Sequence, residues 1–252
     1  MRTSRRPGAT PALLIVLSII AGCSDVISFL GLDGLFTSHI TGNLVLLAAH
    51  VVAGGDARTS KLLAVPVYIA IVAATTILAR RLESRGIPSL RPLLLIQLLL
   101  LIGFLVSCVT AGPNIDTGAA RVILAGMVGV SAMAVQNTLV QISLEGMPAT
   151  AMMTGNVTRF AIDVSEVLMG KDAARVSKAR ARATQTFPLI VGFGSGCALG
   201  AAFEAAFGLW ALAVPTALAG LALALGFVVI PRAEDLSHAF GPAMPPATSK
   251  AD

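Results

Sequence analysis

Apolar residues in this chain are gathered into long runs that are broken by short polar stretches. A membrane-spanning helix needs about 20 consecutive, mostly apolar residues. Six runs come close to or reach that length, and the pattern therefore predicts an all-α integral membrane protein with about six transmembrane helices. The six runs are Ala12–Leu30, Leu62–Ala79, Pro92–Ala111, Val122–Ile142, Thr186–Ala206 and Leu209–Ile230.

Two further apolar stretches, Leu44–Ala53 and Val157–Met169, are only about half as long as a span. If they enter the membrane and return, they are half-helices and the chain crosses six times. If they cross, the chain has eight spans. The loop Arg80–Arg91 separates these alternatives, because cytoplasmic loops carry an excess of Lys and Arg. Six spans place that loop in the cytoplasm with both termini, and we favour this topology.

The composition agrees with a bilayer as the solvent. Of the 252 residues, 56% are hydrophobic and only 12% are charged, against about a quarter charged in soluble proteins. This excludes a cytosolic enzyme, a secreted domain and a disordered regulator. The net charge of +5 comes from basic residues between apolar runs, so membrane topology explains it better than nucleic-acid binding, which we do not expect.

An internal repeat links the two halves of the chain. Leu32–Leu35 matches Leu144–Met147, Thr41-Gly42-Asn43 matches Thr154-Gly155-Asn156, and Ser24-Asp25 pairs with Gln136-Asn137, at separations of 112 or 113 positions. The predicted organisation is a basic cytoplasmic N-terminus (1–11), repeat 1 (12–111), a linker (112–118), repeat 2 (119–230) and a disordered tail (231–252), with both repeats in one membrane domain. Three crossings per repeat would make the repeats inverted, as in many secondary transporters. Aquaporin-like channels also pair two half-helices.

The repeated Thr-Gly-Asn motifs stand where the half-helices are expected to begin. A helix that starts inside the membrane directs unpaired N–H groups at what precedes it, which suits an anionic or polar solute. The predicted substrate-binding residues are Thr41, Gly42, Asn43, Thr154, Gly155, Asn156, Gln136 and Asn137. The alternative for the motifs is a self-contained helix cap, in which Thr and Asn satisfy their own helix end.

Asp25 lies within the first predicted span, where a charge is costly and should face a cavity or the bundle interior. Its counterpart is the neutral Asn137, so Asp25 is the candidate site for ion or proton coupling. The alternative is a structural hydrogen bond between the two repeats. His39 and His50 could relay protons or simply be hydrogen-bonded.

Arg159, Asp163 and Glu166 share one face of the second half-helix. Arg159 and Asp163 are candidates for a gate, although a local salt bridge at the cytoplasmic surface is the favoured interpretation. Gly192, Gly196 and Gly200 form a helix-contact face, either within the protein or between the protomers of a homo-oligomer.

The sequence offers little for catalysis or metal binding. Its three cysteines, Cys23, Cys108 and Cys197, lie in apolar runs and form no disulfide framework or metal motif. No metalloprotease, P-loop or dinucleotide motif occurs, so we expect neither an enzyme nor a bound cofactor or metal. The segment up to Cys23 also looks like a bacterial lipoprotein signal, but the apolar run continues past it to Leu30.

The chain resembles the YoaK family through Gly22 with Asp25, Thr41-Gly42-Asn43 and Gln136-Asn137. The resemblance covers roughly Leu13–Ile230. It implies a small multispanning protein of the bacterial inner membrane, sometimes labelled a small-molecule permease, and it supplies no substrate and no catalytic residues. We therefore expect a secondary transporter or permease for a small polar or anionic solute. The alternatives are a passive channel and a non-transporting membrane scaffold.

Overall fold

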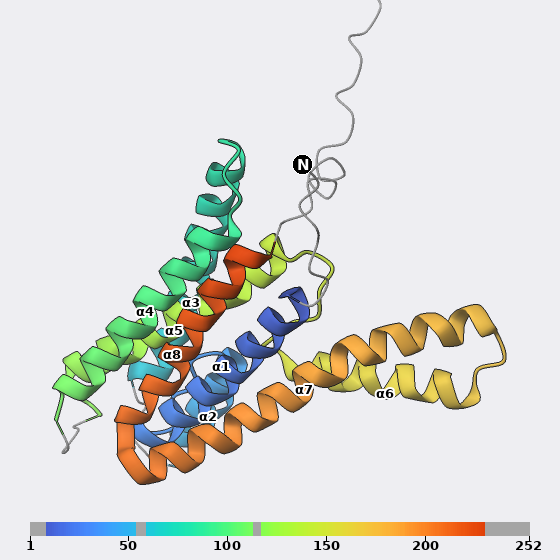
Figure 1. Ribbon diagram of the computed structural model, residues 1–252. Helices are drawn as coiled ribbons and strands as arrows, with labels where there is room; N and C mark the ends of the chain where they lie inside the picture. Colours follow the sequence, from blue (N-terminus) through green and yellow to red (C-terminus); the bar gives the residue numbers. More distant parts are fainter. Residues whose placement is uncertain (1–8, 54–58, 113–116, 230–252) are drawn as a thin grey trace, which may run out of the picture.

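The computed structural model describes residues 9–53, 59–112 and 117–229, and these residues form helices without any strand. The fold class predicted from the apolar runs is confirmed: the protein is all-α, with long apolar helices typical of a membrane protein. In chain order the elements are α1 Ala9–Gly31, α2 Ile40–Val52, α3 Thr59–Glu83, α4 Leu90–Thr110, α5 Ala120–Ser143, α6 Met153–Met169, α7 Ala173–Phe207, the 3-10 helix η1 Gly208–Leu212, and α8 Ala213–Val228 (Figure 1).

Five segments of the described chain are long and apolar enough to cross a membrane. Four of them are α1, α3, α4 and α5, each close to a predicted span. The fifth runs over Ala173–Val228 and contains the fifth predicted span and most of the sixth. The chain turns within it at Gly208, whose φ of 57° is one that glycine adopts without strain. Helix α8 has only 16 residues, so the number of crossings stays a prediction.

Helix α7 is longer than the sequence pattern indicated. It has 35 residues, or ~52 Å at 1.5 Å per residue, whereas the hydrocarbon core of a bilayer is about 30 Å thick. Its polar N-terminal part projects from the bundle and pairs with α6 in a two-helix hairpin (Figure 1). Hydropathy alone reads that part as a loop, because four basic residues lie between positions 175 and 182.

The two short helices begin earlier than predicted. Helix α2 starts at Ile40 rather than Leu44 and has 13 residues, and α6 starts at Met153 rather than Val157 and has 17 residues. Both Thr-Gly-Asn motifs therefore lie in the first helical turn, not ahead of it. In the described residues, neither helix receives a side-chain hydrogen bond from its N-cap residue.

Helices α1 and α5 form the most buried part of the bundle, and each packs against the other half of the chain. Helix α1 contacts α7 and α8, whereas α5 contacts α3 and α4. The short helices occupy matching places in the two halves: α2 packs on α3, and α6 packs on α7. In Figure 1, α1 runs from near the middle of the view toward the lower left, and α5 runs the opposite way.

The glycine face of α7 is already used within the chain. Gly196 packs so closely on α1 that an added Cβ would lie 2.4 Å from the carbonyl oxygen of Ile19. Gly192 and Gly200 face the backbone of the same helix, and Cys23 donates from its thiol to the Gly196 carbonyl at 3.0 Å. A homo-oligomer through this face, one of the two alternatives considered, would thus compete with α1 for the same surface.

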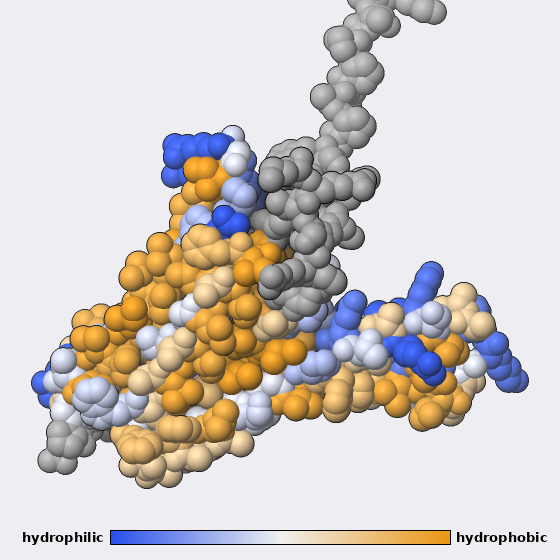
Figure 2. Space-filling model, in the orientation of Figure 1, coloured by the Kyte–Doolittle hydropathy of each residue, from blue (hydrophilic) through white to orange (hydrophobic). Residues whose placement is uncertain are grey.

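The surface separates into an apolar side and polar ends. Figure 2 shows hydrophobic residues over the side of the bundle, and hydrophilic residues at the tip where α3 meets α4 and at the far end of the α6–α7 hairpin. The predicted tail 231–252 and most of the basic N-terminus 1–11 lie outside the described residues, as do Arg58 and positions 113–116 of the linker.

The close contact between α1 and α7 can be tested with two matched glycine variants. Gly196→Ala should destabilise the protein by ~1–3 kcal/mol, because its Cβ meets the α1 backbone. Gly194→Ala, where an added Cβ meets nothing within 4 Å, should be neutral or stabilising by about 0.5–1 kcal/mol. Unfolding in mixed micelles titrated with a denaturing detergent measures both. Equal stability of the two variants would contradict the packing described.

Candidate functional site

Asp25 is the most completely coordinated polar group of the bundle. Its side chain is buried in α1, with 2% of the residue surface exposed. Thr37 donates from its backbone N at 2.9 Å and from its hydroxyl at 3.0 Å, both to Oδ1. Ser38 donates from its backbone N to Oδ1 at 2.6 Å and from its hydroxyl to Oδ2 at 2.8 Å. The His39 ring nitrogen Nδ1 bonds to Oδ2. We call these four residues the carboxylate cluster.

The carboxylate cluster fills the position at which the sequence analysis placed an anionic solute. Thr37 and Ser38 directly precede His39, the N-cap residue of α2. The free N–H groups there suit an anion, and the protein's own Asp25 provides it. The structure gives Asp25 no hydrogen bond to Asn137 within the described residues, so the interpretation of Asp25 and Asn137 as a bonded pair between repeats is wrong.

The loop after α1 is fastened at a second point. Lys61, in the first turn of α3, is 1% exposed. Its Nζ donates to the backbone oxygen of Asp33 at 2.7 Å and lies 3.7 Å from the Asp33 carboxylate. Asp33 has a left-handed φ of 55° and is followed by Gly34 with φ 78°. This ion pair holds the turn that leads to the carboxylate cluster.

The asparagines of the two Thr-Gly-Asn motifs make matching contacts. Asn43 accepts from the backbone N of Phe36 at 2.9 Å and donates to its oxygen at 2.8 Å. Asn156 donates to the oxygen of Ala149 at 2.6 Å, again seven residues earlier. Both side chains are buried. Each asparagine therefore closes the loop ahead of its own short helix.

The threonines and glycines of these motifs are differently placed. Thr41, Thr154 and Gly155 are exposed. An added Cβ on Gly155 would meet nothing within 4 Å, whereas one on Gly42 would lie 2.9 Å from the Phe36 ring. The structure therefore separates the buried asparagines from the other motif residues, which could contact a solute only from the open side of the short helices.

A second buried polar group lies where the two halves meet. Gln97 of α4 donates from Nε2 to Oε1 of Gln136 in α5 at 2.7 Å. Gln136 donates from Nε2 to the Leu17 carbonyl at 2.9 Å and to the Thr150 hydroxyl at 3.2 Å. Both glutamines are fully buried. We call Gln97, Gln136, Thr150 and the Leu17 carbonyl the amide cluster.

Asn137 lies beside this cluster in sequence but has a different partner. Its Nδ2 donates to the Tyr68 hydroxyl of α3 at 2.9 Å. Asn137 is 6% exposed, and Tyr68 is half-buried. Of the predicted binding residues, Gln136 and Asn137 thus both connect the second half of the chain to the first.

Asp163 forms its ion pair across the hairpin instead of along its own helix. Arg182 of α7 donates from Nε to both carboxylate oxygens at 3.0 and 3.2 Å, and from Nη2 to Oδ1. Asp163 is 1% exposed, whereas Arg159 is exposed. The favoured interpretation of a local salt bridge needs correction, because the partner of Asp163 is Arg182 and not Arg159.

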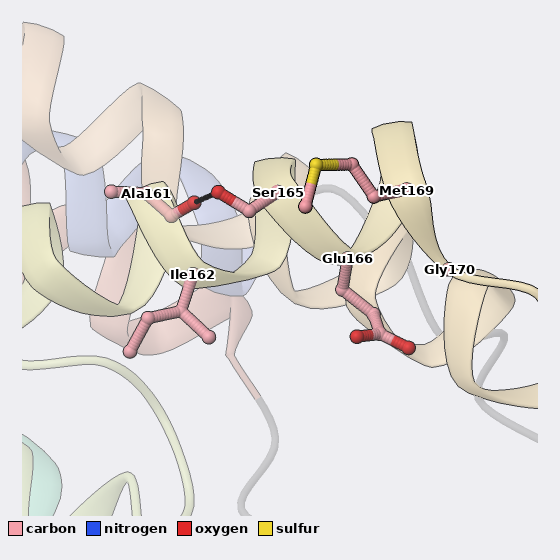
Figure 3. A pocket seen from close by; sticks show the side chains of 6 residues that line it. All are labelled: Ala161, Ile162, Ser165, Glu166, Met169 and Gly170. Carbon is pink, nitrogen blue, oxygen red and sulfur yellow. Dashed lines mark hydrogen bonds between the residues drawn. The ribbon is translucent and has the colours of Figure 1, made fainter.

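A shallow groove of about 490 Å³ follows the C-terminal half of α6 (Figure 3). Ala161, Ile162, Ser165, Glu166, Met169 and Gly170 line it. None of the predicted site residues is among them. Within residues 9–53, 59–112 and 117–229, no group of three or more His, Cys, Asp or Glu side chains could hold a metal ion.

The comparison with protein families bears on this arrangement. A family model described as "Protein of unknown function (DUF1275)" matches residues 13–225 of the 252. The chain belongs to this family. No curated protein and no solved structure matches it. Membership in the DUF1275 family carries no activity, so function has to be argued from the geometry.

Several residues that shape the site in this DUF1275 member were not predicted. Thr37 and Ser38 give a cap-like signal just ahead of α2, and the two hydroxyl residues could have been linked to Asp25. Gln97 is the one polar residue between Leu93 and Val106, which is the strongest missed signal. Thr150 and Arg182 carry no such signal, because each has its partner on the preceding helix, 14 or 19 residues earlier, and no helical spacing links them.

The pairing of His39 with Asp25 predicts a pH-dependent stability. The hydrogen bond to Asp25 raises the His39 pKa above its usual 6.5, against the opposing effect of burial. A group whose pKa is higher in the folded state than in the unfolded state stabilises the fold. This contribution is complete below the unfolded-state pKa and is lost as the pH rises through the folded-state pKa. Stability should therefore fall as the pH rises above about 6.5, the ordinary pKa of histidine.

His39→Gln should remove this dependence, and thermal unfolding at several pH values would measure it. His50→Gln is the matched control, because within the described residues the His50 ring bonds to the Leu46 carbonyl one turn away, at 2.7 Å, and to no carboxylate. The control should keep the wild-type profile. A wild-type profile that does not change when His39 is replaced would rule out the pair as its source.

Proposed function

We propose that the protein is a secondary transporter or permease for a small polar solute, without enzymatic activity, in the bacterial cytoplasmic membrane. The carboxylate cluster is the observation that carries the proposal. An ionisable residue inside a membrane helix is costly and is usually functional. Here it also holds the start of a half-length helix. The finer resemblance to the YoaK family stays a prediction.

Asp25 is the coupling residue in this proposal. Protonation removes the charge that its four Thr37 and Ser38 donors stabilise, and charge-assisted hydrogen bonds are roughly twice as strong as neutral ones. The start of α2 is then held more weakly and can move. His39, whose side chain is 36% exposed, is the route by which a proton reaches Asp25.

The correspondence between the halves supports an inverted repeat. Helices α1 and α5 make matching contacts with the third and fourth helices of the other half, and the two asparagines close matching loops. Transporters built in this way bind their solutes near the midplane, at interrupted helices. The solute site would then lie between the amide cluster and the starts of α2 and α6.

Proton coupling can be tested in proteoliposomes that contain a pH-sensitive dye. Small amides, polyols and carboxylates are added in turn, and Asp25→Asn should abolish solute-dependent proton movement. Thr41→Val with Thr154→Val should weaken it about tenfold or less, because both side chains are exposed. Asp172→Asn, at an exposed α7 cap, is the control. Unchanged uptake in Asp25→Asn would refute this role, and flux without saturation or coupling would indicate a channel.

The inverted topology predicts which positions share a side of the membrane. In a chain without Cys23, Cys108 and Cys197, single cysteines are placed at Arg85, Arg175 or Thr59. The first two should react with an impermeant thiol reagent from the cytoplasmic side and the third from the other side, as the positive-inside rule requires. If all three positions react from one side, the repeats are not inverted.

A further inference from the structure

The amide cluster has an open end at Gln97. A glutamine amide offers one acceptor oxygen and two N–H donors. Gln136 uses its oxygen and both donor directions, toward Gln97, Leu17 and Thr150. Gln97 uses one N–H, toward Gln136, and its Oε1 is buried without a hydrogen-bond partner among the described residues. Buried acceptors are nearly always satisfied in folded proteins, so this oxygen indicates a missing partner.

Rotating the Gln97 amide does not remove the open acceptor. The Leu17 carbonyl can only accept, so the Gln136 Nε2 must face it and the Gln136 oxygen must face Gln97. A flipped Gln97 would place two carbonyl oxygens against each other. The observed orientation leaves Gln97 with one acceptor, Oε1, that has no partner in the described residues, and with a second N–H beside its bond to Gln136.

The cluster draws on both halves of the chain. Gln97 comes from α4, Gln136 from α5, the carbonyl of Leu17 from α1, and Thr150 from the loop ahead of α6. Thr150 is 1% exposed, and the N-cap of α6, Met152, receives no side-chain bond. In the first half the matching loop is held by the carboxylate of Asp25. In the second half, the loop ahead of α6 is instead bonded through Thr150 to the neutral amide of Gln136.

We propose that Gln97, with Gln136 and Thr150, forms a subsite for a neutral solute that presents both a hydrogen-bond donor and an acceptor, as a primary amide does. The inference rests on the proposed transport function and names its substrate class. A carboxylate is disfavoured, because its lone pairs would face the Gln97 oxygen and no cationic group belongs to the cluster. The anion-binding position at α2 is filled by Asp25 itself.

Ser24 gives this subsite a counterpart. Its hydroxyl is also buried without a partner in the described chain, and the internal repeat pairs Ser24 with Gln136. It lies seven residues beyond Leu17 on α1, ~10 Å along the helix axis. Ser24 and Gln97 are thus the two residues whose buried side-chain atoms lack a partner within the described residues.

Binding can be measured separately from transport. The full-length protein in nanodiscs is heated with increasing malonamide, a neutral diamide, or with malonate, the dianion of the same skeleton. Malonamide should raise the Tm in a saturating manner, because ligands that bind the folded state stabilise it, and malonate should not. In Gln97→Leu the apparent affinity should fall at least tenfold. Gln141→Leu, which replaces an exposed glutamine of α5, should behave as wild type.

If Gln97→Leu does not fold, Gln97→Asn is tested instead. This variant keeps the amide but withdraws it by one methylene group, so the apparent affinity for malonamide should again fall. A full malonamide shift in either folded variant, an equal shift with malonate, or no malonamide shift in the wild type overturns the subsite. Malonamide flux into proteoliposomes is measured in parallel. Binding without flux supports the subsite and refutes transport, so the two failures are distinguishable.

Discussion

A carboxylate buried in a membrane helix has no water to solvate it, and the protein must supply every partner. Asp25 obtains its partners from three consecutive residues of one loop. That requirement draws the chain back against α1 directly after it leaves the helix. It explains why α2 begins inside the bundle and has only 13 residues. The ion pair between Lys61 and Asp33 then holds the next turn in place.

The second half keeps the same architecture with different chemistry. Asn156 closes its loop as Asn43 does, but among the described residues no carboxylate bonds to the start of α6. The residue that matches Asp25 is Asn137, which bonds to Tyr68, and Gln136 reaches the loop through Thr150. One half thus holds an ionisable group and the other a neutral amide group. Such a division suits a protein that handles a proton and a neutral solute at separate places.

The spans could be predicted because the bilayer thickness alone sets their length, and α1, α3, α4 and α5 lie close to the apolar runs. The polar first part of α7 could not be predicted as a helix, because hydropathy does not distinguish a solvated helix from a loop. The hydropathy pattern also could not predict which helices and side chains contact one another. The glycines of α7 showed a contact face, but only the three-dimensional arrangement identifies α1 as its occupant. Arg182 likewise meets Asp163 only because α7 folds back along α6.

The packing also constrains how the protein could move. Because α1 and α5 each pack into the opposite half, and the Gly196 contact leaves no space for a Cβ, separation of the two halves would break a tight contact between α1 and α7. Helices α2 and α6 pack chiefly on one neighbour each, and elements with few contacts open at the lowest free energy. Each is fastened by one buried acid, Asp25 or Asp163. Motion of the short helices, released at those acids, is therefore less costly than separation of the two halves.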